Sequence, residues 1–267
     1  MARSALLNVM VGAAEKAGRS LVRDFGEVAN LQVSRKGPAD FVSRADQRAE
    51  EILLAELERA RPDWGFLGEE GTNKRGDGQH RFIVDPLDGT SNFLHGIPHF
   101  AVSVALERQG ELMAGVVFNP VHDELFVAER GNGAFLNNTR MRVAARDDLS
   151  TALMATGLPF MGHGDQLRTL AELQPLFSRT AGVRRFGAAA LDLAWVAAGR
   201  FDGFWEHNIH AWDMAAGIVL VREAGGFVSD ADGREKMFET GSVVAGNEYM
   251  QRALLKNIKE ARTAGLE

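Results

Sequence analysis

Hydrophobic and polar residues recur at helical spacing in the N-terminal part of the chain. Up to Phe25, apolar residues stand three or four positions apart, and they are Leu6, Met10, Ala14, Ala17, Leu21 and Phe25. This spacing predicts an amphipathic helix with Ser4 as its N-cap. A basic residue before an apolar run is also the outline of a signal peptide, but the charged opposite face favours the helix. The stretch from Ser43 to Ala60 repeats the pattern until Pro62 stops it, so it predicts a second helix.

The middle of the chain has the pattern of short strands. Trp64–Gly68 and Phe82–Val84 are short apolar pieces that predict two strands. From Phe100 to Val143, apolar segments are separated by turn signals such as "RQGE", "NPVHDE" and "RGNG", which predicts an antiparallel meander.

Strands and helices alternate in the last part of the chain. Strands are expected at 153–156, 183–186, 201–206, 227–228 and around "SVVAGN", and helices at 165–177, 188–198, 213–224 and from about Asn247. Sheets with helices layered against them follow, an α/β or α+β sandwich of layers. No fixed repeat and no linker divides the chain, so we expect one compact domain over 1–267, with subregions of approximately 1–145 and 146–267.

Composition narrows the class of protein. The chain of 267 residues is 45% hydrophobic and 25% charged, with a net charge of −6 and no run of Lys or Arg, so nucleic acid is an unfavourable primary partner. No stretch approaches the roughly 20 apolar residues that a membrane span requires. The absence of cysteine excludes disulfides and thiolate metal sites. We expect a cytoplasmic protein that acts on a small molecule.

The stretch "IVDPLDGTSNFLHG" carries the first candidate chemistry. Asp85 follows an apolar strand, and Pro86 fixes the backbone so that Asp88 comes round in a tight loop. Two carboxylates at one point repel, so one must take up a proton or both must share a cation. Oxygen ligands without Cys or clustered His select Mg²⁺, Mn²⁺ or Ca²⁺. Gly89 and Thr90 add backbone N–H groups and a hydroxyl, which suit a phosphate.

A simple Asp-Gly turn is an equal alternative for this stretch taken alone. Three further acidic positions favour the metal site. "LGEEG" places Glu69 and Glu70 at a strand end, where a solvated loop is the alternative. Asp213 opens an apolar helix, where an N-cap is the alternative, and Asp46 stands at a capping-box spacing from Ser43. These alternatives do not explain why so many acids end apolar elements in one chain.

Together the motifs "GEEG", "VDPLDGTSNF" and "WDMAAGIVLVREAGG", with "GAAALDLAWVAAGRFDGFWE" before the last, resemble the inositol monophosphatase family of the lithium-sensitive, Mg²⁺-dependent sugar phosphatases. The likeness extends from "KGPADFVSRADQ" at Lys36 to Asn247. It implies a layered αβαβα fold, a homodimer, and Mg²⁺-dependent hydrolysis of a phosphate monoester, most of all myo-inositol monophosphate. Two or three Mg²⁺ ions are implied, with Mn²⁺ as a possible substitute.

The resemblance also implies a role for each matching residue. The metal ligands would be Glu69, Asp85, the Leu87 carbonyl, Asp88 and Asp213, with Asp85 bridging two ions. The residues that prepare the attacking water would be Thr90, Asp46 and Glu70. The substrate contacts would be Asp88, Gly89, Thr90, Arg184, Ala189, Glu206 and Asp213. Ala188 stands where relatives often carry Ser or Thr, so one hydroxyl contact is missing.

Other readings stay open. The same chemistry could serve fructose 1,6-bisphosphate, NADP or phosphoadenosine phosphate, or the chain could be a regulatory, protein-binding member of the same fold. The segment between Glu70 and Asp85, "GTNKRGDGQH", is Gly-rich and polar, which predicts a mobile lid or loop that affects the weakest metal. His207 and His210 have a zinc-like spacing, but we expect them at the site rim or in the core because no further ligands are nearby.

Overall fold

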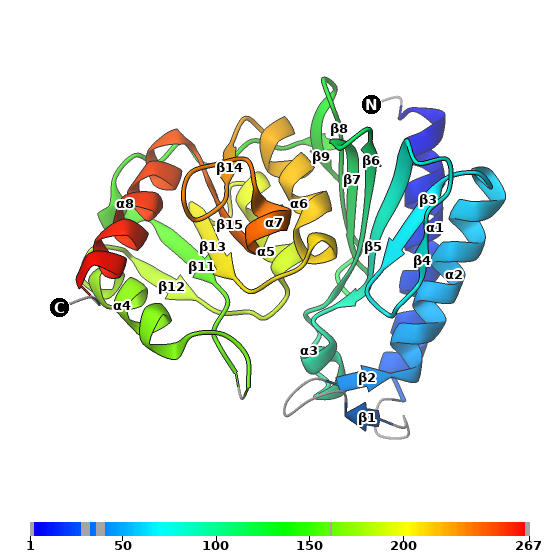
Figure 1. Ribbon diagram of the computed structural model, residues 1–267, viewed down its shortest axis with the longest axis horizontal. Coiled ribbons are helices and arrows are strands. Elements are labelled where there is room, and N and C mark those ends of the chain that lie inside the picture. The colour runs from blue at the N-terminus through cyan, green and yellow to red at the C-terminus, as the bar shows by residue number, and fades with distance from the viewer. Residues whose placement is uncertain (1–2, 28–32, 36–40, 161, 265–267) are drawn as a thin grey trace.

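Two β-sheets and three pairs of helices form five layers in the computed structural model, which describes residues 3–27, 33–35, 41–160 and 162–264 (Figure 1). Helices α1 and α2 cover the outer face of the first sheet, α5 and α6 lie between the two sheets, and α4 and α8 cover the outer face of the second (Figure 1). The order of layers is αβαβα, and the predicted fold class is confirmed.

The first sheet has eight strands in the order β10-β9-β8-β7-β6-β5-β3-β4. They are β3 (Gly65–Gly68), β4 (Asn73–Lys74), β5 (His80–Asp88), β6 (Ala101–Arg108), β7 (Glu111–Asn119), β8 (Glu124–Glu129), β9 (Gly133–Leu136) and β10 (Thr139–Arg140). Strands β5 to β10 pair antiparallel, which confirms the meander, whereas β3 runs parallel to β5.

The second sheet has five strands in the order β12-β11-β13-β15-β14. They are β11 (Leu153–Thr156), β12 (Gly182–Arg184), β13 (Gly203–His207), β14 (Phe227–Ser229) and β15 (Ser242–Gly246). The long helices are α1 (Ala5–Phe25), α2 (Arg44–Ala60), α4 (Gln166–Phe177), α5 (Ala189–Ala197), α6 (Ala211–Glu223) and α8 (Glu248–Ala264). Each predicted helix is present, with bounds within about two residues of those expected.

Helix ends follow local chemistry. The Ser4 hydroxyl accepts a hydrogen bond from Leu7 N at 3.0 Å, so the predicted N-cap of α1 is confirmed. Helix α2 begins at Arg44, directly after the small strand β2 (Phe41–Ser43). Strand β2 pairs with β1 (Val33–Arg35), so Ser43 belongs to the strand and not to the helix. The start of the family-like segment, at 36–40, lies outside the described residues. Two short helices, α3 (Thr90–Leu94) and α7 (Met237–Thr240), were not predicted.

Helices α5 and α6 are buried almost all round because a sheet lies on each side of them. A helix without a polar face is stable where it is buried on all sides, as it is in this layer. One hydrophobic cluster therefore joins residues of both sheets, among them Ile83 and Val117 of the first and Phe204 and Val243 of the second. The division into one domain with two subregions stays a prediction.

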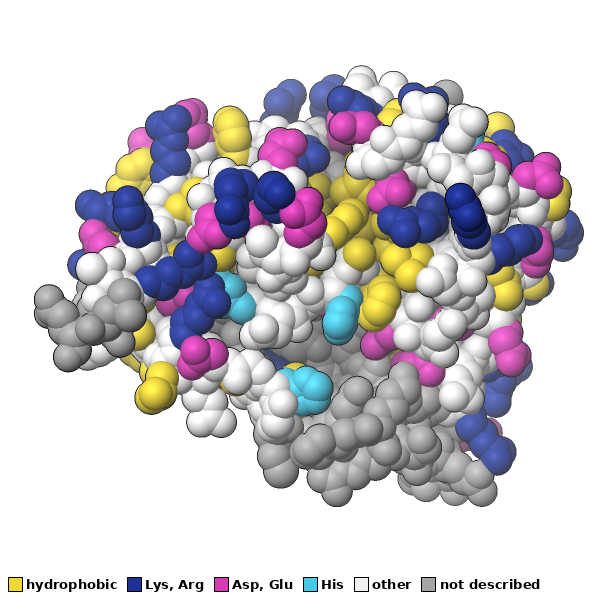
Figure 2. All heavy atoms as spheres, in the orientation of Figure 1, with side chains coloured by type: hydrophobic (Ala, Val, Ile, Leu, Met, Phe, Trp, Pro, Cys, Tyr) yellow, Lys and Arg dark blue, Asp and Glu magenta, His cyan; other side chains and the backbone are white. Residues whose placement is uncertain are grey.

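Two observations concern the partners that the sequence made unfavourable, nucleic acid and membrane. On the face shown in Figure 2, Lys and Arg side chains are interspersed with Asp and Glu and form no continuous basic surface. Of the helices in the described part of the chain, none is both long enough and apolar enough to cross a membrane.

Close approach of α6 to β7 depends on Gly115. A Cβ atom added there would lie 2.6 Å from the Ala216 carbonyl oxygen. We expect Gly115→Ala to lower the free energy of unfolding by about 1–3 kcal/mol, because the helix must move away from the sheet. Urea denaturation measures this. The matched control is Gly12→Ala in α1, where an added Cβ meets nothing within 4 Å and should leave stability unchanged or raised.

Candidate active site

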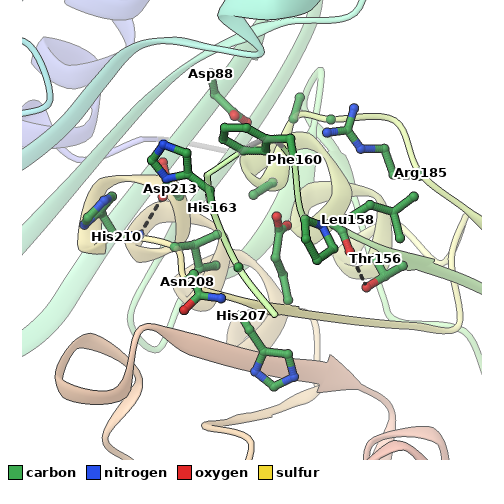
Figure 3. A pocket seen from close by; sticks show the side chains of 18 of the residues that line it. Asp88, Thr156, Leu158, Phe160, His163, Arg185, His207, Asn208, His210 and Asp213 are labelled. Atoms are coloured by element: carbon green, nitrogen blue, oxygen red, sulfur yellow. Dashed lines mark hydrogen bonds between the residues drawn. The ribbon is translucent and has the colours of Figure 1, made fainter. Parts of the chain in front are cut away.

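A cavity of about 440 Å³ opens where the two halves of the molecule meet. Its walls come from the ends of β3, β5 and β13 and from the starts of α5 and α6, and they include Glu69, Asp88, Gly89, Thr90, Ala189, Glu206 and Asp213. Figure 3 shows Asp88 and Asp213 entering this cavity from different elements. Side chains far apart in the sequence therefore share one cavity.

The two aspartates of the "VDPLDGT" stretch lie inside strand β5 and not in a loop after it. Residues three apart in a regular strand point to opposite faces of the sheet. Against β6, however, Asp85 pairs with Ser103 and Asp88 with Ala101, so β5 carries one extra residue between the two pairs. This bulge lets both carboxylates face the same side. The predicted tight loop is thus corrected to a bulged strand end.

The turn after β5 places Thr90 beside Asp46. Gly89 has φ +91°, and a Cβ there would lie 2.9 Å from the His99 carbonyl oxygen, so the position requires glycine. The Thr90 hydroxyl lies 2.9 Å from the Leu87 carbonyl oxygen and 3.3 Å from Asp46 Oδ2. The contact between Thr90 and the buried Asp46 of α2 is therefore present.

Glu50, which the sequence analysis did not single out, holds the "GEEG" turn. Its two carboxylate oxygens accept hydrogen bonds from Glu70 N at 2.8 Å and from Thr72 N at 3.1 Å. A Cβ added at Gly68 would lie 2.3 Å from Glu50 Oε2, so glycine is needed for this approach. Glu50 is only 3% exposed on the apolar face of α2. A glutamate among the apolar positions of this helix is the feature of the sequence that could have indicated such a structural role.

Asp213 combines two structural roles. It is the third residue of α6, not the first, and its Oδ2 accepts a hydrogen bond from His210 N at 2.6 Å, which caps the helix (Figure 3). Likewise Asp88 Oδ2 accepts from Ala190 N at 2.7 Å at the start of α5, and Asp85 Oδ1 accepts from Leu87 N at 2.9 Å. Each aspartate thus uses one oxygen on a backbone N–H.

Burial and mutual repulsion raise the pKa of these acids. The pKa of Asp85 is raised well above its usual value by burial and then by Glu69, Asp88, Asp213 and Asp46. The pKa of Asp88 is raised by burial and by Asp213, against the Ala190 N–H, which lowers it. Burial raises the pKa of Asp213 to about 6. The predicted acids therefore lie close enough to repel one another.

These donors fit a hard divalent cation. In the described ranges no group of three or more His, Cys, Asp or Glu side chains has positions that could hold a metal ion as they stand. The set is nevertheless made of carboxylates that together raise the local negative charge density, and only one oxygen of each aspartate is used in the backbone bonds described above. Oxygen donors with a local excess of negative charge are what Mg²⁺ and Mn²⁺ bind.

The polyol contacts predicted from the sequence are placed unequally. Glu206 and Ala189 line the cavity, whereas Arg184 lies outside the lining, exposed, with its guanidinium on the Val183 carbonyl oxygen at 3.3 Å. Its neighbour Arg185 lines the cavity instead (Figure 3). Successive residues of an extended segment point to opposite sides, so the sequence "RR" could not distinguish them.

The two histidines have protein partners. His207 Nε2 lies 3.0 Å from Glu172 Oε2, and its Nδ1 lies 3.0 Å from Arg168 Nη2. Because a guanidinium only donates, Nδ1 is the acceptor and the proton sits on Nε2. His210 is the N-cap residue of α6 and stacks on Trp212. Both residues line the cavity, as expected for rim positions.

The segment predicted as a lid forms part of the first sheet. Asn73 and Lys74 make strand β4, which pairs antiparallel with β3, and Asp77 accepts hydrogen bonds from Gln79 N and His80 N, both at 2.8 Å. Hydrogen bonds from the His80 backbone N–H, the His80 side chain and the Gln79 backbone N–H lower the pKa of Asp77 to about 2. A role for this hairpin as a lid stays a prediction.

Comparisons with known proteins show which family the chain belongs to. The model of the inositol monophosphatase family matches residues 2–263, and the chain belongs to that family. It is 64% identical over 260 residues to the inositol-1-monophosphatase of Rhizobium meliloti, covering 97% of this chain and 98% of the relative. It is 45% identical over 259 residues to a Pseudomonas aeruginosa protein named Nus factor SuhB, covering 95% and 96%.

A solved structure supports the fold assignment. The crystal structure of the extragenic suppressor protein suhB from Bartonella henselae matches with a TM-score of 0.93 and 60% identity, covering 96% of this chain and 99% of that one. The predicted family and the predicted class of enzyme, a phosphoric monoester hydrolase, are confirmed.

Acid repulsion makes stability depend on pH. Burial, then the charge of Asp213, raises the pKa of Glu206 from 4.5 to about 8. A carboxyl whose pKa is higher in the folded chain favours folding less as pH rises toward that value. With EDTA present, we expect the wild type to lose melting temperature relative to Glu206→Gln between about pH 5 and pH 8, by roughly 5 °C. A difference that stays constant over this range would contradict the expectation.

Proposed function

We propose that this protein hydrolyses the phosphate monoester of a small polyol, most of all myo-inositol monophosphate, in an Mg²⁺-dependent reaction. The observation that carries the proposal is the group of buried aspartates Asp85, Asp88 and Asp213, whose pKa values are raised by burial and, for Asp85 and Asp88, by neighbouring acids. Asp88 and Asp213 line the cavity together with Gly89 and Thr90. Such a group is costly to the fold unless cations neutralise it. A phosphate ester needs the same cations for its hydrolysis.

The family resemblance supports the following metal ligands. Glu69, Asp85 and the Leu87 carbonyl would hold one Mg²⁺, and Asp85, Asp88 and Asp213 a second, with Mn²⁺ as a substitute and a third, weaker ion near Glu69. When bound, these cations lower the pKa of the attacking water and neutralise the leaving oxygen.

The chain's own residues orient the reactants. Thr90 has one hydroxyl proton, which it can donate to the Leu87 carbonyl oxygen or to Asp46, so its lone pairs are left to accept a hydrogen bond from the attacking water. When the water loses its proton to Thr90 Oγ1, the Thr90 proton passes to the Asp46 carboxylate. Glu70 supports this network through the turn that Glu50 fixes. Backbone N–H groups of Gly89 and Thr90 bind phosphate oxygens, which aligns the ester for in-line attack.

The polyol lies toward the second half of the cavity. Glu206, whose pKa in the metal-free protein is raised by burial and by Asp213 to about 8, lines this part of the cavity, and its carboxyl can accept hydrogen bonds from substrate hydroxyls in either protonation state. The backbone at Ala189 adds a further contact, and Arg185 takes the place first assigned to Arg184. Ala188 offers no hydroxyl. The same family resemblance supports a lithium-sensitive, cytoplasmic homodimer.

Mg²⁺-dependent phosphate release from myo-inositol 1-phosphate tests the proposal. We expect Asp85→Asn to lower kcat by about 1,000-fold or more, because a ligand shared by two ions is lost, a change worth several kcal/mol. The matched control, Asp123→Asn, removes an exposed carboxylate from a hairpin turn and should keep full activity. Full activity of Asp85→Asn in EDTA would contradict the proposal.

The name of the Rhizobium meliloti relative favours inositol monophosphate over other esters. Fructose 1,6-bisphosphate, NADP and phosphoadenosine phosphate are the alternatives within the same chemistry. A phosphate-release screen over these esters, with and without Li⁺, ranks them by kcat/KM.

A second function is favoured by the name Nus factor SuhB on the Pseudomonas aeruginosa relative. We propose that this protein, on the same fold, also binds a regulatory protein partner independently of catalysis. Tagged wild type and Asp88→Ala should then capture the same partner from the native cell extract. Loss of the partner in Asp88→Ala, or no partner for the wild type, would contradict independent binding.

A further inference from the structure

We propose that Asn92 is a positioning residue that sets how the polyol-binding half of the cavity meets its acidic half. The proposal rests on the proposed function, because it concerns the same cavity. Asn92 lies in α3, two residues after Thr90, and is 8% exposed. Its side chain does not line the cavity, so its effect is exerted through the backbone it holds.

The Asn92 amide joins two segments that are far apart in the sequence. Its Nδ2 lies 2.9 Å from the His99 carbonyl oxygen and 2.8 Å from the Phe186 carbonyl oxygen. An amide nitrogen carries two protons, so each carbonyl receives one of them. The Gly187 carbonyl oxygen is more distant, at 3.5 Å. His99 leads into β6 of the first sheet, whereas Phe186 leads from β12 of the second sheet into α5.

Two further contacts join the same two segments of the chain. Ala190 N donates to Asp88 Oδ2 at 2.7 Å, and a Cβ at Gly89 would lie 3.4 Å from Ala188 Cβ. Residues 88–92 therefore pack along residues 186–190, and we call this contact the seam. On one side of the seam is a proposed metal ligand, and on the other the start of α5 with the proposed polyol contact at Ala189.

Asn92 holds the part of the seam that is most able to move. Gly187 follows Phe186 and has φ +80°, a left-handed conformation that glycine adopts without strain and that acts as a pivot before α5. Fixing the Phe186 carbonyl removes freedom at this pivot. Without that bond, α5 can shift relative to Asp88, and a misplacement of about 1 Å can cost on the order of 100-fold in rate.

The consequence differs between substrates. An ester with a polyol uses both sides of the seam, the acids for its phosphate and the start of α5 for its hydroxyls. An ester without hydroxyls, such as p-nitrophenyl phosphate, uses only the acidic side. A positioning role for Asn92 therefore predicts a selective loss, whereas a purely structural role lowers both activities together.

The experiment compares kcat/KM for myo-inositol 1-phosphate and p-nitrophenyl phosphate in the full-length protein with Mg²⁺. For Asn92→Ala we expect a loss of about 10- to 100-fold with the inositol ester and less than about 3-fold with the nitrophenyl ester. Asn92→Asp should lose more than Asn92→Ala with the inositol ester, because a carboxylate would face two carbonyl oxygens. Asn92→Ser keeps one donor, so it should fall between the wild type and Asn92→Ala.

Asn132→Ala and Asn132→Asp are the matched controls, since Asn132 is exposed at the β8–β9 turn, and they should leave the ratio of the two activities unchanged. Equal losses with both esters, or no loss in any Asn92 variant, would overturn the positioning role. A wild type that hydrolyses neither ester would instead refute the proposed function.

Hydrogen exchange tests the seam independently of activity. In Asn92→Ala, the amide of Ala190, which is bonded to Asp88 in the wild type, should exchange at least about 10-fold faster, while the amides of the distant β7–β8 pair keep their rates. Unchanged exchange at Ala190 would show that Asn92 does not hold the seam, whatever the activity.

Discussion

Repulsion between buried carboxylates is the constraint on which this structure depends. Asp85 and Asp88 are 1% and 8% exposed. Burial raises the pKa of both, and neighbouring carboxylates raise it further, Glu69 and Asp88 for Asp85 and Asp213 for Asp88. The fold offsets part of this cost with one backbone N–H for each aspartate, from Leu87, Ala190 and His210. Under the proposed function, divalent cations neutralise the rest of the negative charge, so the cost to folding and the capacity for catalysis would have the same source.

Layer order decides where this group of acids can form. The middle helices α5 and α6 are buried between the two sheets, and their N-terminal ends meet the bulged end of β5. Helix starts provide backbone N–H groups, which favour negative charge. The site therefore belongs to neither half of the chain alone, and the hydrogen bonds across the seam decide its geometry.

Much of the fold follows from the sequence, because apolar periodicity reports directly on burial. The amphipathic α1, the meander from β6 onward and the alternation after 143 were predicted from that pattern. Convergence of the acids was predicted as well, since Asp85 and Asp88 end an apolar run. What periodicity cannot report is contact between distant segments. Glu50 and Asn92 act through backbone groups of other elements. The side of the chain on which Arg184 and Arg185 lie depends on the local twist. The bulge in β5 appears only in its register with β6.

The central claim is that these acids share divalent cations, and calorimetric titration of Mg²⁺ into the metal-free protein tests it most directly. At about pH 6, in two buffers of different ionisation enthalpy, the account predicts uptake of at least two ions per chain with release of protons, because Asp213 has a pKa of about 6 and must lose its proton to bind. Uptake should weaken strongly in Asp85→Asn. No cation uptake by the wild type, or uptake without proton release that is unchanged in Asp85→Asn, would contradict the account.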